Sequence, residues 1–425
     1  MREPALLRRR YLILKLAALC LTALALAACG PRAAPSPSPA GLVVAMPEGG
    51  AATAMRAAAA SYQQVSGETV RVETLASDGY AAQVNAALLA GLDRYDLVFL
   101  NADSLASWAG YHALQPLDMP LDPQAAAPWQ PAVTVAGKQY GLPVQPDPLV
   151  LWYRADLLAQ QGLAVPRDWA AFREAALALN APPARYGAAI AGSDQEAGAD
   201  FAAVLAGYGV QAVSPTYQVE MGSASARAAL ALYAGLRNQD GVVAPGADQA
   251  GSADVVAALQ AGKAALGLAP LSAAAQLGQC STGSADQSPV CAQGKPLLAW
   301  AWLPGLDPAT AVGRLDTWAI PLHARPAAQR FVQWLGSDAG ARAWASGGGV
   351  PANTRVLADS SIPGAAALAG LRDFRLAFPQ ATTVDQLWTA SHQAVHAAIT
   401  GSASPETALQ TAAQQMQQAL RQGGY

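Results

Sequence analysis

From Gly41 onward, the chain alternates short apolar stretches with longer amphipathic ones. Stretches such as LVVAM and DLVFL have the length and composition of buried strands, and the segments between them have helical periodicity. The predicted strands are 42–46, 69–75 and 96–100, and the predicted helices are 53–65 and 78–92. This alternation is typical of α/β proteins, so we predict that fold class.

Polar side chains follow the ends of these predicted strands. In open α/β sheets, ligands bind beyond the carboxyl ends of the strands. The residues that fall on this rim are Glu48, Asp78, Tyr80, Asn101 and Asp103. Asp78 and Asp103 are equally suited to capping the helix that follows each of them.

Residues 1–28 resemble a bacterial lipoprotein signal. Four arginines precede an apolar run from Tyr11 to Ala28, and small residues stand before Cys29. Such a signal is cut before the cysteine, whose thiol is then lipidated. The alternative is a transmembrane helix, since about eighteen apolar residues can just span a bilayer.

Removal of the signal changes the charge of the chain. Five basic groups and one acidic group leave, so the mature part holds 21 basic and 28 acidic residues and has a formal charge of −7. This balance excludes nucleic acid as a partner, and membrane attachment must come from the acyl chains. Residues 29–40 would form the anchor and a Pro-rich tether, whose segment 31–39 extends to about 28 Å.

Two cysteines remain in the mature chain besides the lipidated one. Cys280 and Cys291 bracket a polar segment, and in an exported chain they are most simply a disulfide. Closing a ring of about 12 residues stabilises the fold by something near 3 kcal/mol. Neither cysteine has another Cys or a His at ligand spacing, so we expect no zinc site.

Five stretches, taken in order, resemble one known family. They are 95–118 (YDLVFLNADSLASWAGYHALQPLD), 141–179 (with YRADL and then PRDWAAF), 259–265 (LQAGKAA), 318–353 (with WAI, FVQWL and GVPAN) and 401–420 (opening GSASPE). The family is that of the family 1 extracellular solute-binding proteins, the sugar-binding type related to maltose-binding protein. Arg154 departs from the Asn usual at that place.

The resemblance implies a two-lobed, periplasmic-binding-protein-like (type II) α/β fold with three interlobe crossings. The crossings would fall near 145–149, 300–304 and 349–353, where Pro and Gly are found. Lobe one would be 41–146 plus 302–349, and lobe two would be 147–301 plus 350–425.

The resemblance also implies a ligand site between the lobes. Asp147 lies at the first crossing and matches an acidic ligand-contacting position, as does Asp103. Trp388 matches an aromatic of the lobe-two wall, and three further tryptophans near the second crossing are candidates that core packing would explain equally well. These three are Trp300, Trp302 and Trp318. Ala269 to Ser272 stand where the maltose-binding relative has a Trp, which argues against a maltodextrin.

The implied function is that of a lipid-anchored, monomeric solute-binding component of an ABC importer. It would capture a mono- or oligosaccharide by hinge closure at the outer face of the cytoplasmic membrane and pass it to the permease subunits. The resemblance implies no cofactor, no metal and no enzymatic activity.

Two other classes remain open from the residues alone. A polyamine, a glycerol phosphate or a metal-type ligand would also suit a cleft with acidic side chains. An exported glycoside hydrolase needs two carboxylates across a sugar, and Asp103 with Asp147 would meet that need. His392 and His396 lie four apart on a predicted helix, but no HExxH motif accompanies them.

Overall fold

The computed structural model describes residues 41–119, 121–277 and 297–425. The predicted signal, tether, lipidated Cys29 and Cys280–Cys291 pair lie outside these residues. None of the described helices is long and apolar enough to cross a membrane.

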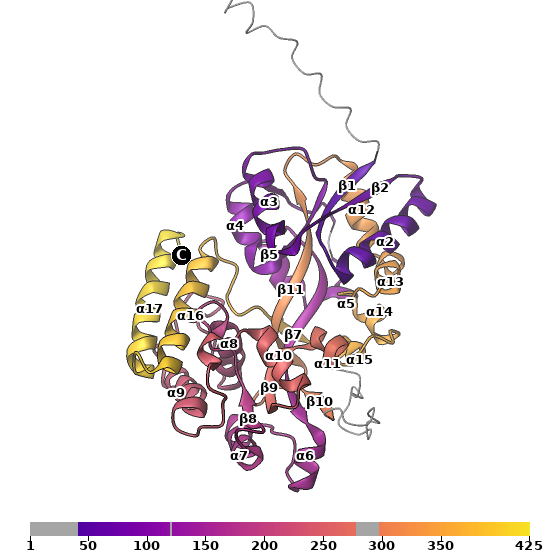
Figure 1. Cartoon of the computed structure of the whole chain (residues 1–425). Coiled ribbons are helices and arrows are strands. Elements are labelled where there is room, and N and C mark those ends of the chain that lie inside the picture. Colours follow the sequence, from indigo (N-terminus) through magenta and orange to yellow (C-terminus); the bar gives the residue numbers. More distant parts are fainter. Residues whose placement is uncertain (1–40, 120, 278–296) are drawn as a thin grey trace, which may run out of the picture. The chain divides into compact units, whose positions relative to one another are not determined.

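One mixed sheet of ten strands runs through residues 41–425, in the order β2-β1-β3-β11-β7-β9-β8, with three further strands paired to its members (Figure 1). The strands are β1 Leu42–Pro47, β2 Val70–Leu75, β3 Leu97–Asn101, β4 Leu114–Gln115, β7 Leu142–Arg154, β8 Tyr186–Ala189, β9 Ala264–Pro270, β10 Leu298–Ala301, β11 Thr310–Pro321 and β12 Asp373–Arg375; β5 Thr134–Val135 and β6 Lys138–Gln139 form a separate hairpin.

Helices cover the sheet and alternate with its strands. The α-helices are α2 Gly50–Ser66, α3 Ser77–Leu89, α4 Leu105–Gly110, α5 Pro123–Ala126, α6 Ala155–Gln160, α7 Trp169–Leu179, α8 Ala197–Gly207, α9 Ala224–Asn238, α10 Ser252–Gln260, α11 Ala274–Leu277, α12 Ala327–Gly336, α13 Asp338–Ser346, α14 Thr354–Ala358, α15 Ala365–Ala369, α16 Val384–Thr400 and α17 Pro405–Gln422. The short 3-10 helices are η1 Ala102–Ser104, η2 Gln130–Val133, η3 Ala247–Gln249 and η4 Leu271–Ala273. The predicted α/β class and all five predicted elements are confirmed, with bounds that differ by a few residues.

Strands β1, β2 and β3 are parallel, and their carboxyl ends point the same way. The helices α2 and α3 follow β1 and β2, as the apolar periodicity indicates. Strand β11 joins the sheet antiparallel to β3, with Asp316 opposite Asn101. This pairing brings the end of β3 beside the middle of β11.

Strands β7 and β11 connect the two ends of the sheet. They are antiparallel over the first half of β7, while the second half of β7 pairs with β9 and β10. A bulge interrupts the β7–β11 ladder at Gln145, whose φ is +51°. The Gln145 N–H donates to the Val350 carbonyl at 2.9 Å, and its Oε1 accepts from the Val350 N–H at 3.1 Å. Two of the three predicted crossings therefore touch each other.

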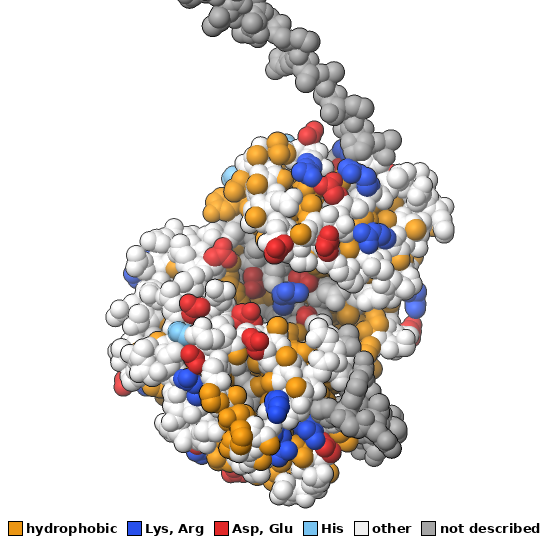
Figure 2. Space-filling model, in the orientation of Figure 1, with side chains coloured by type: hydrophobic (Ala, Val, Ile, Leu, Met, Phe, Trp, Pro, Cys, Tyr) orange, Lys and Arg blue, Asp and Glu red, His pale blue; other side chains and the backbone are white. Residues whose placement is uncertain are grey.

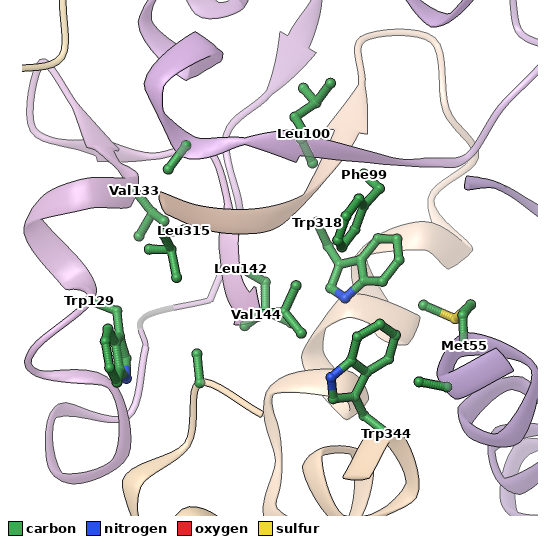
Figure 3. Packing of buried hydrophobic residues seen from close by; sticks show 14 of the residues in the cluster. Met55, Phe99, Leu100, Trp129, Val133, Leu142, Val144, Leu315, Trp318 and Trp344 are labelled. Carbon is green, nitrogen blue, oxygen red and sulfur yellow. The ribbon is translucent and has the colours of Figure 1, made fainter. Parts of the chain in front are cut away.

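Two clusters of buried side chains form the core. The first fills the space around β1, β3 and β11, where Trp318 packs between Phe99 at 4.9 Å and Trp344 at 5.7 Å between ring centroids (Figure 3). The second lies among α7, α8, α9, α16 and α17. Leu303 packs in the second cluster and Leu315 in the first, while Trp300 and Ala311 pack in the first and Val312 in the second, so this stretch of chain contributes to both clusters.

Trp318→Ala should remove about 3–5 kcal/mol from the free energy of unfolding, because the indole is fully buried and leaves a large cavity. Urea unfolding followed by circular dichroism measures the loss. Leu177→Ala, at an exposed position of α7, is the control and should change stability by less than about 0.5 kcal/mol. A loss of similar size in both variants would contradict the packing described.

Candidate functional site

A cleft of about 630 Å³ opens between the carboxyl end of β3, the β7–β11 pair, helices α8 and α16 and the start of α10. Figure 2 shows this hollow, with acidic side chains around a basic one. The polar and aromatic residues of its lining are Asn101, Asp103, Asp147, Gln195, Glu196, Asp200, Ser252, Ser272, Arg314, Trp388 and His392.

Asp147 and Arg314 form the floor of the cleft. They are register partners on β7 and β11, so both side chains leave the sheet at the same place. The two backbones come unusually close here, since a Cβ on Gly313 would lie 2.5 Å from the Asp147 carbonyl oxygen. Glycine at 313 is therefore a steric requirement of the floor.

Asp147 is held in place by one serine. Its Oδ1 accepts from the Ser272 N–H at 2.9 Å and its Oδ2 from the Ser272 hydroxyl at 2.7 Å. Burial raises the pKa of Asp147, although the Ser272 hydrogen bonds and the Arg314 charge oppose the rise. The carboxylate is thus fixed in orientation and has lone pairs left for a ligand.

Arg314 is the basic residue of the lining, and its side chain is 59 % exposed. Its guanidinium donates to Asp316 at 3.3 Å, and its charge also favours ionisation of Asp103 and Asp147. Burial nevertheless raises the pKa of Asp316 to about 6. The charge of Arg314 therefore acts on three carboxyl groups, those of Asp103, Asp147 and Asp316.

Asp103 and Trp388 meet across the cleft. The indole Nε1–H donates to Asp103 Oδ2 at 3.2 Å, while Oδ1 is buried and has no hydrogen-bond partner among the described residues. Burial raises the pKa of Asp103 to about 6, against the effects of Trp388 and Arg314. A buried acceptor without a partner costs free energy, which a donor on a ligand would recover.

Trp388 is stacked on His392. The ring centroids are 5.3 Å apart with an interplanar angle of 16°, and Phe378 packs edge-on against the indole at 4.8 Å. The His392 Nδ1 accepts from the Gly198 N–H at 2.9 Å, so a neutral ring carries its proton on Nε2. Burial lowers the pKa of His392, which keeps the ring neutral and leaves Nε2–H as a donor.

Asp200 lies deepest among the acids of the lining. Its Oδ2 accepts from the Ala191 N–H and from the Tyr233 hydroxyl, both at 3.1 Å. Burial raises the pKa of Asp200 to about 7. Glu196 lies at the exposed mouth instead, where its Oε2 accepts from the Ser252 N–H at 2.7 Å.

The structure brings four of the predicted site residues to this cleft. They are Asn101, Asp103, Asp147 and Trp388. Asn101 also caps η1 by accepting from the Asp103 N–H at 3.0 Å, whereas the Asp103 side chain makes no cap.

The other six predicted site residues do not line the cleft. Glu48 and Asp78 are exposed near the ends of β1 and β2. The Tyr80 hydroxyl hydrogen-bonds to the backbone carbonyls of Ala45 in β1 and Phe99 in β3. Trp318 is buried in the core. Trp300 and Trp302 pack edge-on against each other at 5.5 Å. A sequence gives the chemistry of an aromatic ring but not the side of the sheet to which it points.

Sequence reasoning missed Arg314, Asp200 and His392 as site residues. Arg314 and Asp316 interrupt an otherwise apolar strand (TAVGRLDTWAIP), and that interruption was a usable signal. The spacing of His392 and His396 gave no predicted site, and in the structure His392 Nδ1 accepts from the Gly198 N–H while His396 Nδ1 bonds to the Gly192 carbonyl at 2.9 Å. Among the described residues, no cluster of His, Cys, Asp or Glu is arranged to hold a metal ion.

Residues 47–342 match the family model of the bacterial extracellular solute-binding proteins, which is more than half of the chain. The chain belongs to this family. Because the family is one of binding proteins, this solute-binding protein is not an enzyme, and the hydrolase alternative falls away. No curated protein matches the chain in sequence.

Solved structures with the same fold are distant in sequence. Maltose-bound MalE3 of T. maritima has a TM-score of 0.71 and 20 % identity over 89 % of this chain and 99 % of its own. A solute-binding protein of Thermotoga lettingae, bound to α-D-tagatose, has a TM-score of 0.72 at 20 % identity and the same coverage. One of Agrobacterium vitis, with bound D-mannitol, has 0.66 at 21 % identity over 90 % and 99 %. These likenesses establish the periplasmic-binding-protein fold.

The stability of the empty protein should fall as pH rises from about 4 to about 7. Burial raises the pKa of Asp200 from 3.8 to about 7, so the folded state keeps a proton that the unfolded chain loses in this window. Asp200→Asn keeps the acceptor and removes the titration, so its melting temperature at pH 8 should exceed that of the parent by several degrees. Differential scanning calorimetry at pH 5 and pH 8 measures both effects.

Asp359→Asn is the control for this comparison, because Asp359 lies on the surface in a pair with Arg342. It should leave the pH dependence as it is in the parent. The prediction fails if the parent is more stable at pH 8 than at pH 5 and Asp200→Asn shows the same pH dependence. That result would mean that folding does not raise the pKa of Asp200.

Proposed function

We propose that this protein captures a small, uncharged polyhydroxylated solute, a mono- or short oligosaccharide or a polyol, for an ABC importer. The observation that carries the proposal is the set of groups in the cleft: an aromatic ring, Trp388, beside carboxylates that surround one guanidinium, Arg314. Sugars have apolar ring faces and hydroxyl edges that both donate and accept, which suits this set.

Arg314 favours a sugar over a polyamine. A polyamine would gain from Asp103 and Asp147 but would bring its cations against the Arg314 guanidinium, whose charge acts on both of them. A hydroxyl edge accepts from the guanidinium and donates to the carboxylates without any such repulsion. The cleft therefore suits a neutral ligand better than a dication.

The size of the cleft and the ligands of similar structures agree with a short ligand. A volume of about 630 Å³ lies within the usual range of about 300–1,000 Å³ for small-molecule sites. Maltose, tagatose and mannitol are the ligands of the structures compared above. Ala269 to Ser272 supply no second aromatic platform, which supports a ligand shorter than a maltodextrin.

We further propose that the cleft closes by a hinge between two lobes, 41–146 plus 302–349 and 147–301 plus 350–425. The passage of β7 and β11 through both regions supports a hinge in these strands. Closure around the ligand would shift the population toward the form that the permease subunits recognise. The Cys280–Cys291 disulfide is part of the proposal for lobe two.

Lipid attachment at Cys29 would keep the protein at the outer face of the cytoplasmic membrane. The basic start, the apolar run and the small residues before Cys29 support this. Growth of the producing bacterium with radiolabelled palmitate should label the parent. The Cys29→Ser variant should remain unlabelled and should not be retained in the membrane fraction. Cys20→Ser, inside the signal, is the matched control and should remain labelled; label on Cys29→Ser would disprove the anchor.

A thermal-shift screen tests the ligand class. Monosaccharides, disaccharides, polyols, glycerol phosphates and polyamines are added to the purified protein, and a ligand at 100 times its dissociation constant should add about 2.7 kcal/mol to stability. We expect the shift from a sugar or polyol, recovered unchanged. Trp388→Ala and Asp147→Asn should abolish it, because the first removes the ring face and the second the charge of a fixed acceptor.

Trp302→Phe is the matched control, since Trp302 lies outside the cleft lining, and it should keep the shift. Arg314→Gln separates the two ligand classes: it should weaken a sugar and strengthen a polyamine. A shift from polyamines alone in the parent would overturn the carbohydrate assignment and leave the fold unaffected.

A further inference from the structure

A patch of exposed apolar side chains lies at the end of the sheet remote from the cleft. Of the seven large hydrophobic side chains that the described part of the chain exposes, four gather here: Leu89 (65 %), Leu92 (52 %), Tyr111 (65 %) and Leu322 (44 %). With His112 and His323 they surround a hollow of about 240 Å³. Figure 2 shows hydrophobic side chains collected over α3 and α4. We call these six residues the apolar patch.

The sequence places the patch at this end for a topological reason. Leu89 ends α3, Leu92 lies between α3 and the start of β3, and Leu322 follows the end of β11, which is antiparallel to β3. From Arg314 on the cleft floor to Leu322, β11 advances about 3.3 Å per residue, so the patch is roughly 25 Å from the cleft. A surface through which ligand passes from the cleft to the permease subunits must lie beside the cleft. The patch is too far from the cleft to serve as that surface.

The patch is joined to the place where the anchored segment enters the fold. Arg325, two residues beyond His323, donates from its side chain to the Gly41 carbonyl and to Asp96. The Asp96 Oδ2 in turn accepts from the Val43 N–H at 2.7 Å. The start of β1 and the patch therefore belong to the same end of the sheet.

The length of chain before Gly41 limits how far this end can lie from a bilayer. Eleven residues separate Cys29 from Gly41, and they span at most about 40 Å. A lipid on Cys29 would therefore keep the patch within reach of the membrane surface.

We propose that the apolar patch rests on the lipid bilayer and holds the anchored protein against it. This inference rests on the lipid attachment proposed above. Leucine and tyrosine are suited to the interface, where apolar groups enter the acyl boundary and the tyrosine hydroxyl stays hydrated. Among the described residues, the lining of the hollow includes no Asp, Glu, Lys or Arg, so the contact is mainly apolar and should depend little on lipid charge. The mature chain, at −7, would gain nothing from an electrostatic contact with anionic lipid.

Photo-crosslinking of the full, acylated chain in vesicles tests this contact. Tyr111→benzoylphenylalanine is reconstituted through its own anchor into phosphatidylcholine vesicles, with and without phosphatidylglycerol, and adducts are identified by mass spectrometry. We expect a lipid adduct in both kinds of vesicle. Its yield should be about tenfold above that of Leu177→benzoylphenylalanine, an exposed position of α7 distant from the patch.

The triple substitution Leu89→Ser, Leu92→Ser and Leu322→Ser should lower the adduct yield at position 111 several-fold while leaving the ligand-induced thermal shift unchanged. Leu322→benzoylphenylalanine gives a second reading if the first probe disturbs folding. In membranes of the producing bacterium, adducts to a second copy of the chain or to a membrane protein, in place of lipid, would overturn the proposal.

The acyl group on Cys29 is measured in the same samples, which separates two kinds of failure. An acylated chain without lipid adducts at 111 and 322 would overturn the bilayer contact and leave the anchor standing. A chain that is not acylated would overturn both.

Discussion

The antiparallel pairing of β7 with β11 is the contact on which the remainder of the molecule depends. It joins the parallel strands β1 to β3 at one end of the sheet to β9 and β8 at the other. Because the pair is continuous, its register decides which side chains leave the sheet in the middle. That register puts Asp147 opposite Arg314, and the close approach at Gly313 keeps the two strands tight at this point. A larger residue at 313 would widen the pair and displace both charges.

The cleft concentrates polar groups that the empty protein satisfies only in part. Within the part of the chain that the structure describes, one oxygen of Asp103 has no hydrogen-bond partner, and the guanidinium of Arg314 makes a long bond of 3.3 Å to Asp316. Such groups reduce the stability of the ligand-free fold. A ligand that supplies complementary donors and acceptors gains binding free energy from them. Asp147 is different, because Ser272 fixes both of its oxygens before a ligand arrives. A preorganised acceptor loses little freedom on binding, which favours affinity.

The sequence allowed the fold to be predicted further than the site. Apolar runs predicted β1 to β3, and a helical period of apolar residues predicted α2 and α3. These patterns are readable because the buried faces of strands and helices must be apolar. Asp103 was a candidate because it follows the end of a predicted strand, and the family resemblance pointed to both Asp103 and Asp147. Trp318 was placed at the site although it packs in the core, since burial draws an indole to either environment. His392 acquires its role from Gly198, nearly two hundred residues away, and no local pattern contains that contact.

The raised pKa values of the cleft acids have a consequence for ligand capture itself. Burial raises the pKa of Asp103 to about 6 and that of Asp200 to about 7, so both lining carboxyls hold a proton more readily than an exposed carboxyl does. A hydroxyl that donates to a carboxylate favours its ionised form and expels that proton to the solvent. A ligand that donates to these carboxyls would then release protons as it binds, and the measured heat of binding would include the ionisation enthalpy of the buffer that receives them.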